Sequence, residues 1–171
     1  LIIGGIGSDT LHGDDEPASA GANDGDDVGL GDAGFVDYED EIISRVETYR
    51  TNGAGDIMTG NAGSDIMLGG LGGDHMWGDA ANAAPGIDGD DIMFGDHGAV
   101  IYDVFTSEAS GPATLSTLAS LVGVTETFAG ADSIRGNAGA DIILGGTDND
   151  TLDGDDHAGS SGNLDGDDIL I

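Results

Sequence analysis

Aspartates recur in this sequence at a fixed distance from glycines, and this spacing is the feature best suited to chemistry. In the stretch GNAGSDIMLGGLGGDHMWGD, residues 60–79, Gly60 and Gly69 are nine residues apart, as are Asp65 and Asp74. Glycines allow sharp turns that point carbonyl oxygens inward, and each turn adds one carboxylate. Calcium prefers such all-oxygen sites, with about 6–8 ligands, whereas magnesium demands tight octahedral geometry. The spacing therefore indicates repeated calcium sites.

The aspartates belong to a nine-residue repeat of the form G-G-x-G-x-D-x-U-x, in which U is a large apolar residue. Clear loops of this form are Gly4–Asp9, Gly60–Asp65, Gly69–Asp74, Gly136–Asp141 and Gly145–Asp150, and weaker loops end at Asp56 and Asp132. We expect the glycines at positions 1, 2 and 4 to adopt positive φ. Each loop leads into a triplet with an apolar residue at position 8, and these triplets are expected to form short strands.

The candidate calcium ligands fall into three groups. The aspartates at position 6 are Asp9, Asp27, Asp56, Asp65, Asp74, Asp91, Asp132, Asp141, Asp150 and Asp168. The aspartates of the GD dipeptides are Asp14, Asp32, Asp79, Asp96 and Asp155. The first glycines of the loops are Gly4, Gly60, Gly69, Gly78, Gly136, Gly145 and Gly154. Longer loops carry extra carboxylates that are either further ligands or solvated, at Asp24, Asp26, Asp88, Asp90, Asp165 and Asp167.

Other metal sites find little support in the sequence. Zinc and copper favour clustered histidine or cysteine, but the chain has no cysteine and its four histidines are scattered. We expect these histidines to face outward or lie in loops: His12, His75, His97 and His157. An EF-hand is not indicated, because no D-x-[DN]-x-[DN]-G loop with a glutamate at position 12 is present.

The composition is strongly acidic, with 34 Asp and Glu against 3 Lys and Arg and a formal net charge of −31. An acidic, glycine-rich disordered linker is one interpretation of such a chain. However, 38% of the residues are hydrophobic, and they lie in phase with the glycines. Nucleic-acid binding is not expected without a basic patch, and no apolar run is long enough to span a membrane. Nothing resembles a nucleophile motif, so no enzymatic activity is expected.

The repeat blocks alternate with segments of a different kind. We divide the chain into repeat block 1 (residues 1–34), a β-hairpin (35–52), block 2 (53–98), a hairpin with a long connection (99–128) and block 3 (129–171). Alternating apolar residues in FVDYEDEIISRVETY and in AVIYDVF…VTETF predict the hairpins. Residues 46–49 are taken to correspond to residues 125–128. Within the connection, Thr114–Val122 is compatible with a short helix.

The loops GGLGGDHMW, GNAGSDIML and GGIGSDTLH resemble the nonapeptide of the RTX (repeats-in-toxin) calcium-binding β-roll family. The resemblance implies an all-β, right-handed parallel β-roll of two nonapeptides per turn, here with hairpin insertions. It also implies that calcium, roughly ten ions, lies between stacked loops, bound by the position-6 aspartates and backbone carbonyls. Position 8 then points into a thin core, including the methionines Met58, Met67, Met76 and Met93.

Positions 7 and 9 are expected to face outward on such a roll, and many of them are apolar. They include Ile66, Leu68, Trp77, Ile92, Phe94, Ile142, Leu144 and Ile169. Either the hairpins fold over these rows, which we favour, or a neighbouring chain covers them. The second alternative would give filaments or lateral self-association.

The resemblance implies an exported protein that folds outside the cell when it meets calcium. We expect a calcium-rigidified extracellular rod, as in an adhesin, a surface filament or a matrix component, whose chain continues beyond both ends of this segment. The alternative is the β-roll tail of a type I-secreted toxin or enzyme. An ice- or ligand-binding solenoid would need a flat row of identical outward residues, which is not present.

Overall fold

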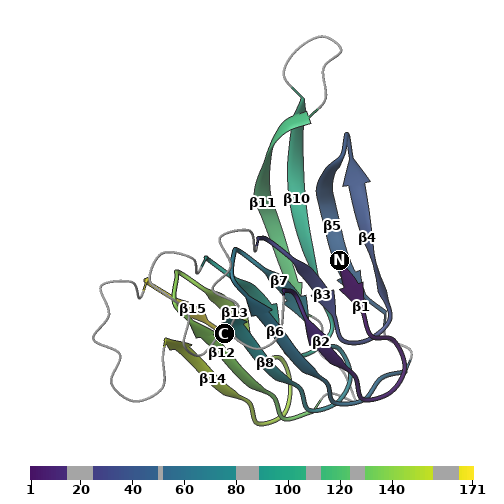
Figure 1. The fold of residues 1–171 in the computed structure, drawn as a ribbon, viewed down its shortest axis with the longest axis vertical. Coiled ribbons are helices and arrows are strands. Elements are labelled where there is room, and N and C mark those ends of the chain that lie inside the picture. Colours follow the sequence, from purple (N-terminus) through teal and green to yellow (C-terminus); the bar gives the residue numbers. More distant parts are fainter. Residues whose placement is uncertain (15–24, 50–51, 80–88, 107–112, 124–129, 156–165) are drawn as a thin grey trace.

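The structure is a computed structural model that describes residues 1–14, 25–49, 52–79, 89–106, 113–123, 130–155 and 166–171. These residues form an all-β fold without a helix (Figure 1). The strands are β1 (Ile2–Ile3), β2 (Thr10–His12), β3 (Val28–Leu30), β4 (Gly34–Glu39), β5 (Ile42–Thr48), β6 (Ile57–Asn61), β7 (Ile66–Leu68), β8 (His75–Asp79), β9 (Ile92–Phe94), β10 (Gly98–Thr106), β11 (Ala113–Gly123), β12 (Ser133–Asn137), β13 (Ile142–Leu144), β14 (Thr151–Asp155) and β15 (Ile169–Leu170). No helix in the described part of the chain is long and apolar enough to cross a membrane.

The repeat triplets form two parallel sheets, and the chain passes from one to the other at every loop. Sheet A has the order β1-β3-β7-β9-β13-β15, and sheet B has the order β14-β12-β8-β6-β2. Because one loop joins each strand to the other sheet, neighbours within a sheet are two repeats apart in sequence. This arrangement is consistent with a β-roll.

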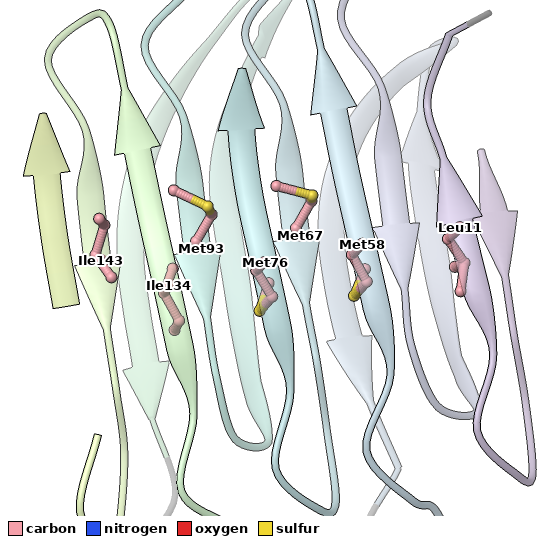
Figure 2. Close-up of a cluster of buried hydrophobic side chains, with 7 residues drawn as sticks. All are labelled: Leu11, Met58, Met67, Met76, Met93, Ile134 and Ile143. Atoms are coloured by element: carbon pink, nitrogen blue, oxygen red, sulfur yellow. The ribbon is translucent and has the colours of Figure 1, made fainter. Parts of the chain in front are cut away.

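A thin core lies between sheets A and B and consists of position-8 side chains, as predicted. It contains Leu11, Met58, Met67, Met76, Met93, Ile134 and Ile143, each at most 5% exposed (Figure 2). Strand register aligns them in rows, with Met58 opposite Met76 and Met67 opposite Met93. Unbranched methionine fills the narrow space between three-residue strands without demanding one fixed shape.

A third, antiparallel sheet, sheet C, is built from two hairpins and has the order β11-β10-β5-β4. Strands β4 and β5 join through Asp40 and Glu41, whose φ values of 49° and 68° fit a two-residue type I′ turn. The hairpins then pair with each other through β5 and β10, with Val46 opposite Val100. The sequence pattern did not predict that the two hairpins would share one sheet.

The second hairpin differs from the one expected from the sequence. Its second strand is β11, which pairs with β10 along most of its length, so the short helix predicted within residues 114–122 is wrong. The long connection predicted over this region is also wrong. Pairing with β10 outweighs the local helix preference, because propensity is weaker than tertiary context. Residues 125–128, predicted to correspond to residues 46–49, lie outside the described residues.

Sheet C covers the outer face of sheet A and creates a second core. This core contains Val28, Leu30, Val46, Ile66, Leu68, Phe94 and Val100, with Val36, Ile43, Ile92, Tyr102 and Leu144 packed against it. The prediction that hairpins fold over the outward apolar positions is therefore confirmed for Ile66, Leu68 and Phe94. Ile169 remains 51% exposed at the end of sheet A, and Trp77 lies on sheet B.

The sequence distinguishes the covered sheet from the uncovered one. In sheet A, positions 7 and 9 are apolar in every strand: Leu1, Ile3, Val28, Leu30, Ile66, Leu68, Ile92, Phe94, Ile142, Leu144, Ile169 and Ile171. In sheet B the same positions are polar apart from Ile57 and Trp77: Thr10, His12, Thr59, His75, Ser133, Arg135, Thr151 and Asp153. The difference follows from the presence of sheet C on one side only.

His97 lies in the loop between β9 and β10, one of the two places predicted for the histidines, but it is buried and does not face outward. It is 1% exposed and lies where the chain leaves sheet A and enters β10. Its Nδ1 is 3.3 Å from Oγ1 of Thr48, which also accepts a hydrogen bond from the backbone N–H of Gly98. The junction between the two sheets therefore buries polar groups in contact with each other. His75 is exposed and His12 half-buried, and His157 lies outside the described residues.

Candidate metal centres

The loops between sheets A and B stack into two columns of position-6 aspartates. Loops that run from sheet A to sheet B bring together Asp9, Asp56, Asp74, Asp132 and Asp150, which we call column 1. Loops that run from sheet B to sheet A bring together Asp27, Asp65, Asp91, Asp141 and Asp168, which we call column 2. All ten predicted position-6 aspartates therefore lie in one of two continuous rows.

Hydrogen bonds connect consecutive aspartates within each column. Except in the first aspartate of each column, the Oδ1 atom accepts the backbone N–H of the aspartate in the preceding turn. In column 1, Asp74 Oδ1 accepts from Asp56 at 2.7 Å, and Asp132 Oδ1 accepts from Asp74 at 2.7 Å. Four such bonds in column 1 and four in column 2 span 2.7 to 3.0 Å. One carboxylate oxygen thus fixes the stacking of the turns.

The second carboxylate oxygen is buried and accepts no hydrogen bond at most of these positions. Among the described residues this applies to Oδ2 of Asp9, Asp56, Asp65, Asp74, Asp91, Asp132 and Asp141. A buried oxygen without a partner is costly, because the desolvation of the group is not compensated. The repetition of the same orphaned oxygen in both columns points to a ligand that repeats with the loops.

The first glycine of each loop lines the space that these oxygens face. A Cβ on Gly60 would lie 2.5 Å from the carbonyl oxygen of Gly78 in the next turn, and closer still to Oδ2 of Asp65. A Cβ on Gly78 would lie 2.7 Å from the carbonyl oxygen of Gly136. A carboxylate oxygen and a carbonyl oxygen therefore converge beside Gly4, Gly60, Gly69, Gly78 and Gly136, each in a cradle that a side chain would fill.

The reason for glycine at position 1 differs from the prediction. Positive φ occurs at position 2 or 4, at Gly5, Gly7, Gly63, Gly70, Gly72, Gly139 and Gly146, and at no position-1 glycine in the described residues. Position 1 requires glycine because of the close approach of oxygens. The non-glycine residues at positions 2 and 4, Asn61, Asn137 and Asp148, adopt φ values of 80° to 83°, which Asn and Asp tolerate best.

The aspartates of the GD dipeptides lie beside the position-6 columns and reach into the next turn. Asp32 is fully buried, and its Oδ2 accepts the N–H of Leu71 at 2.6 Å. Oδ2 of Asp96 accepts both the N–H and the hydroxyl of Thr147. Oδ2 of Asp79 accepts the N–H of Ala138 at 3.3 Å. Asp14 and Asp155 occupy the matching position of their loops.

Some of the extra carboxylates of the long loops have a structural contact. Oδ1 of Asp26 accepts the N–H of Ser64, and Oδ1 of Asp90 accepts the N–H of Ala140, both at 2.9 Å. These bonds are exposed and link neighbouring turns of column 2. Asp167 is exposed, and Asp24, Asp88 and Asp165 lie outside the described residues.

Burial changes the protonation of the columns. It raises the pKa of Asp74 to about 9, against the hydrogen bond from Asp56 and with added repulsion from Asp132. It raises the pKa of Asp91 to about 10, and repulsion by Asp79 adds to this. Burial also raises the pKa of Asp65 to about 8. In the folded chain these carboxyl groups therefore need either a proton or a cation at neutral pH.

The chemistry of the cradles fits calcium. Each combines carboxylate and carbonyl oxygens and contains no nitrogen or sulfur ligand, which is the donor set of a hard cation. No three acidic or histidine side chains converge on one point in the part of the chain that the structure describes. Backbone carbonyls must therefore supply much of the coordination, as the positions of the loop glycines allow.

Three glycines that line the cradles were not predicted from the sequence. Gly13, Gly31 and Gly95 lie in the same cradles as the predicted glycines, each against a column aspartate and a glycine carbonyl of the next turn. The loops that begin at Gly31 and Gly95 contain the hairpins, so the aspartates that complete them, Asp56 and Asp132, follow much later in the chain. The GD dipeptide directly after a strand is the signal that could have identified all three.

Comparison with known families agrees with this geometry. A family model described as the RTX calcium-binding nonapeptide repeat, in four copies, matches residues 1–16, 50–82 and 126–156. Searches among curated proteins and among solved structures found no significant match. The matched ranges lie in all three repeat blocks and contain aspartates of both columns. The repeat blocks of this chain are therefore repeats of the RTX calcium-binding nonapeptide family.

Proposed function

We propose that this chain is a calcium-binding structural segment that becomes a rigid rod when calcium fills both aspartate columns. The observation that carries the proposal is a repeated pair of oxygens, one an orphaned carboxylate oxygen and one a glycine carbonyl, found at Asp9, Asp56, Asp65, Asp74, Asp91, Asp132 and Asp141. The eight hydrogen-bonded steps of the columns define eight spaces between turns. One ion in each space would give eight ions, close to the roughly ten expected from the sequence.

Charge neutralisation is the proposed driving force. Eight divalent ions carry sixteen positive charges, about half of the formal net charge of −31. Without cations, ionised aspartates in adjacent turns repel one another across a few ångströms, and strands of three residues bury too little apolar surface to compensate. Binding of calcium to the folded chain alone would stabilise it by mass action.

The fold in this proposal is a right-handed parallel β-roll with two nonapeptides per turn and hairpins attached on one side. The role is non-catalytic and extracellular, in an adhesin, filament or matrix protein, where millimolar calcium is available. The covered face of sheet A supports this role, because sheet C packs against its central strands and would stiffen them. A stiffened side layer favours a rod over a secretion-assisting tail that must only fold after export.

Far-UV circular dichroism during a calcium titration of the chelator-treated chain tests the proposal. We expect a cooperative gain of β signal with calcium and none with magnesium at the same concentration. Titration calorimetry should give close to eight ions per chain. A chain that is fully folded in chelator at pH 8, or that remains disordered in 10 mM-scale calcium, would refute calcium-dependent folding, since extracellular calcium modules bind at about 10⁻⁴ to 10⁻³ M.

A further inference from the structure

The outer apolar row of sheet A extends beyond the hairpin sheet at both ends. Beneath sheet C the row is sealed, with Leu30 and Leu68 at 0% exposure and Phe94 at 2%. Toward the ends it opens: Ile3 on β1 is 44% exposed and Ile169 on β15 is 51% exposed. Among the described residues, positions of the same type in sheet A are therefore covered in the centre of the sheet and exposed at its ends.

The cover itself is made of two equivalent hairpins. Gly34 pairs with Thr48 in the first, and Gly98 pairs with Gly123 in the second. Both hairpins have a register shift at the same place, after the third residue that follows this glycine. The hairpins are therefore two copies of one structural unit, although their second strands differ in sequence.

The hairpins can pair with each other because sheets A and C add the same number of strands per repeat module. From one hairpin to the next, sheet A gains two strands, from β3 to β9, and sheet C gains the two strands of one hairpin. Neighbouring strands lie about 4.8 Å apart, so both layers advance by about 9.6 Å per module. Successive hairpins consequently reach each other without strain, and β5 pairs with β10.

The two outer edges of sheet C repeat the edges that already pair inside it. β4 occupies the place of β10 in its hairpin, and β11 occupies the place of β5 (Figure 1). Val100 of β10 is opposite Val46 and is 0% exposed, whereas the equivalent residue of β4, Val36, is only half-buried. Among the described strands, β10 has a neighbour on both sides whereas β4 has one only on the side of β5, which accounts for the difference.

We infer that each free edge of sheet C, together with the bare end of sheet A beside it, forms one docking surface for a further β-hairpin of the same kind. The partner is the hairpin of an adjoining repeat module. It would hydrogen-bond to β4 and cover Ile3, or hydrogen-bond to β11 and cover Ile169. A single hairpin would pair with the edge strand and also cover the exposed apolar side chains. Its pairing would repeat the interface between β5 and β10. The inference does not depend on calcium occupancy.

An extension of the chain at its C-terminal end tests this directly. Residues 31–94 are appended after Ile171, which holds the same repeat position as Leu30, so the new hairpin should dock on β11. In the matched control, the part from Gly31 to Asp56 is replaced by the six-residue turn Gly69–Asp74. This removes the hairpin but keeps the number of position-6 aspartates.

The chain has no cysteine, so Ile169→Cys provides a unique thiol probe on the bare row. In calcium, we expect the labelling rate of this thiol to fall about tenfold or more in the extension with the hairpin, relative to the extension without it. Ile57→Cys on the uncovered sheet B, 44% exposed, should label at equal rates in both extensions.

Equal labelling of the Ile169→Cys thiol in the two extensions would overturn the inference. So would protection in the unextended chain that grows with protein concentration, because a second copy would then be the partner. Calcium uptake should be the same in both extensions. A failure of calcium binding would therefore count against the proposed function and not against this docking surface.

Discussion

Replacement of Asp74 by asparagine should have opposite effects on folding with and without calcium. Asp74 lies in the middle of column 1, is 0% exposed, and uses Oδ1 to accept the N–H of Asp56. Asparagine keeps this oxygen and the shape of the side chain but replaces the orphaned Oδ2 with an amide. The amide can donate to the carbonyl oxygen of Gly95, which lies in the same cradle.

The two magnitudes follow from the structure. In the calcium-free folded chain, burial raises the pKa of Asp74 to about 9, so at pH 7 the group must take up a proton on folding. From an ordinary pKa of 3.8 this costs about 4 kcal/mol at about 1.36 kcal/mol per pH unit, a cost that asparagine removes. In calcium, loss of one ion present at 100 times its Kd removes about 2.7 kcal/mol.

Far-UV circular dichroism in chelator at pH 7 measures the first effect, and chemical unfolding in 10 mM-scale calcium measures the second. We expect Asp74→Asn to increase the β signal in chelator, because folding there becomes more favourable by up to about 4 kcal/mol, and to lower the free energy of unfolding in calcium. The matched control is Asp103→Asn, which removes the same charge from an exposed position of sheet C and should change little. Destabilisation of Asp74→Asn in calcium with no gain of β signal in chelator would show that the carboxylate is only a backbone acceptor.

Further predictions concern protonation, the cradles and the second core. In calcium-free buffer the folded chain should be more stable at pH 5 than at pH 8 by circular dichroism, because stability from a raised pKa is lost as pH rises through it, about 7 for Asp132 and about 8 for Asp65. Gly60→Ala should weaken calcium binding in calorimetry by filling its cradle, whereas Gly25→Ala, with nothing within 4 Å of the added Cβ, should not. Phe94→Ala should cost about 3–5 kcal/mol in urea unfolding, because it empties the core between sheets A and C.

The sequence predicted the repeating unit well because its constraints are local. The glycine and aspartate spacing located all ten column aspartates, and position 8 located the core residues of sheets A and B. It gave the wrong reason for glycine at position 1, since that reason is an approach between two turns distant in sequence. It also misassigned residues 114–122, whose strand exists only because β10 lies beside them.

The covered face was present in the sequence but required knowledge of the path of the chain. Apolar residues at positions 7 and 9, such as Leu68 and Phe94, alternate with polar ones, such as Thr59 and Arg135. Once the triplets are assigned alternately to two sheets, the apolar set falls almost entirely on one of them. Strands can be assigned to sheets A and B only when each loop that contains a hairpin is treated as one turn of the roll. Gly31 and Asp56 must therefore be recognised as the two ends of one loop.

The two carboxylate oxygens of a column aspartate have different roles: Oδ1 fixes the stacking of the turns, and Oδ2 makes their stability depend on calcium. Oδ1 accepts a hydrogen bond from a backbone N–H of the neighbouring turn. This bond involves no cation, so it specifies the stacking of the turns with or without calcium. At Asp74, for example, Oδ2 accepts no hydrogen bond and lies in the same cradle as the carbonyl oxygen of Gly95, so two oxygens with negative charge repel each other. Protonation relieves this for one oxygen at a time, whereas a calcium ion relieves it for carboxylate and carbonyl together. The stacked fold is thus geometrically complete without calcium but electrostatically incomplete, which is why we expect its stability to follow calcium concentration more steeply than pH.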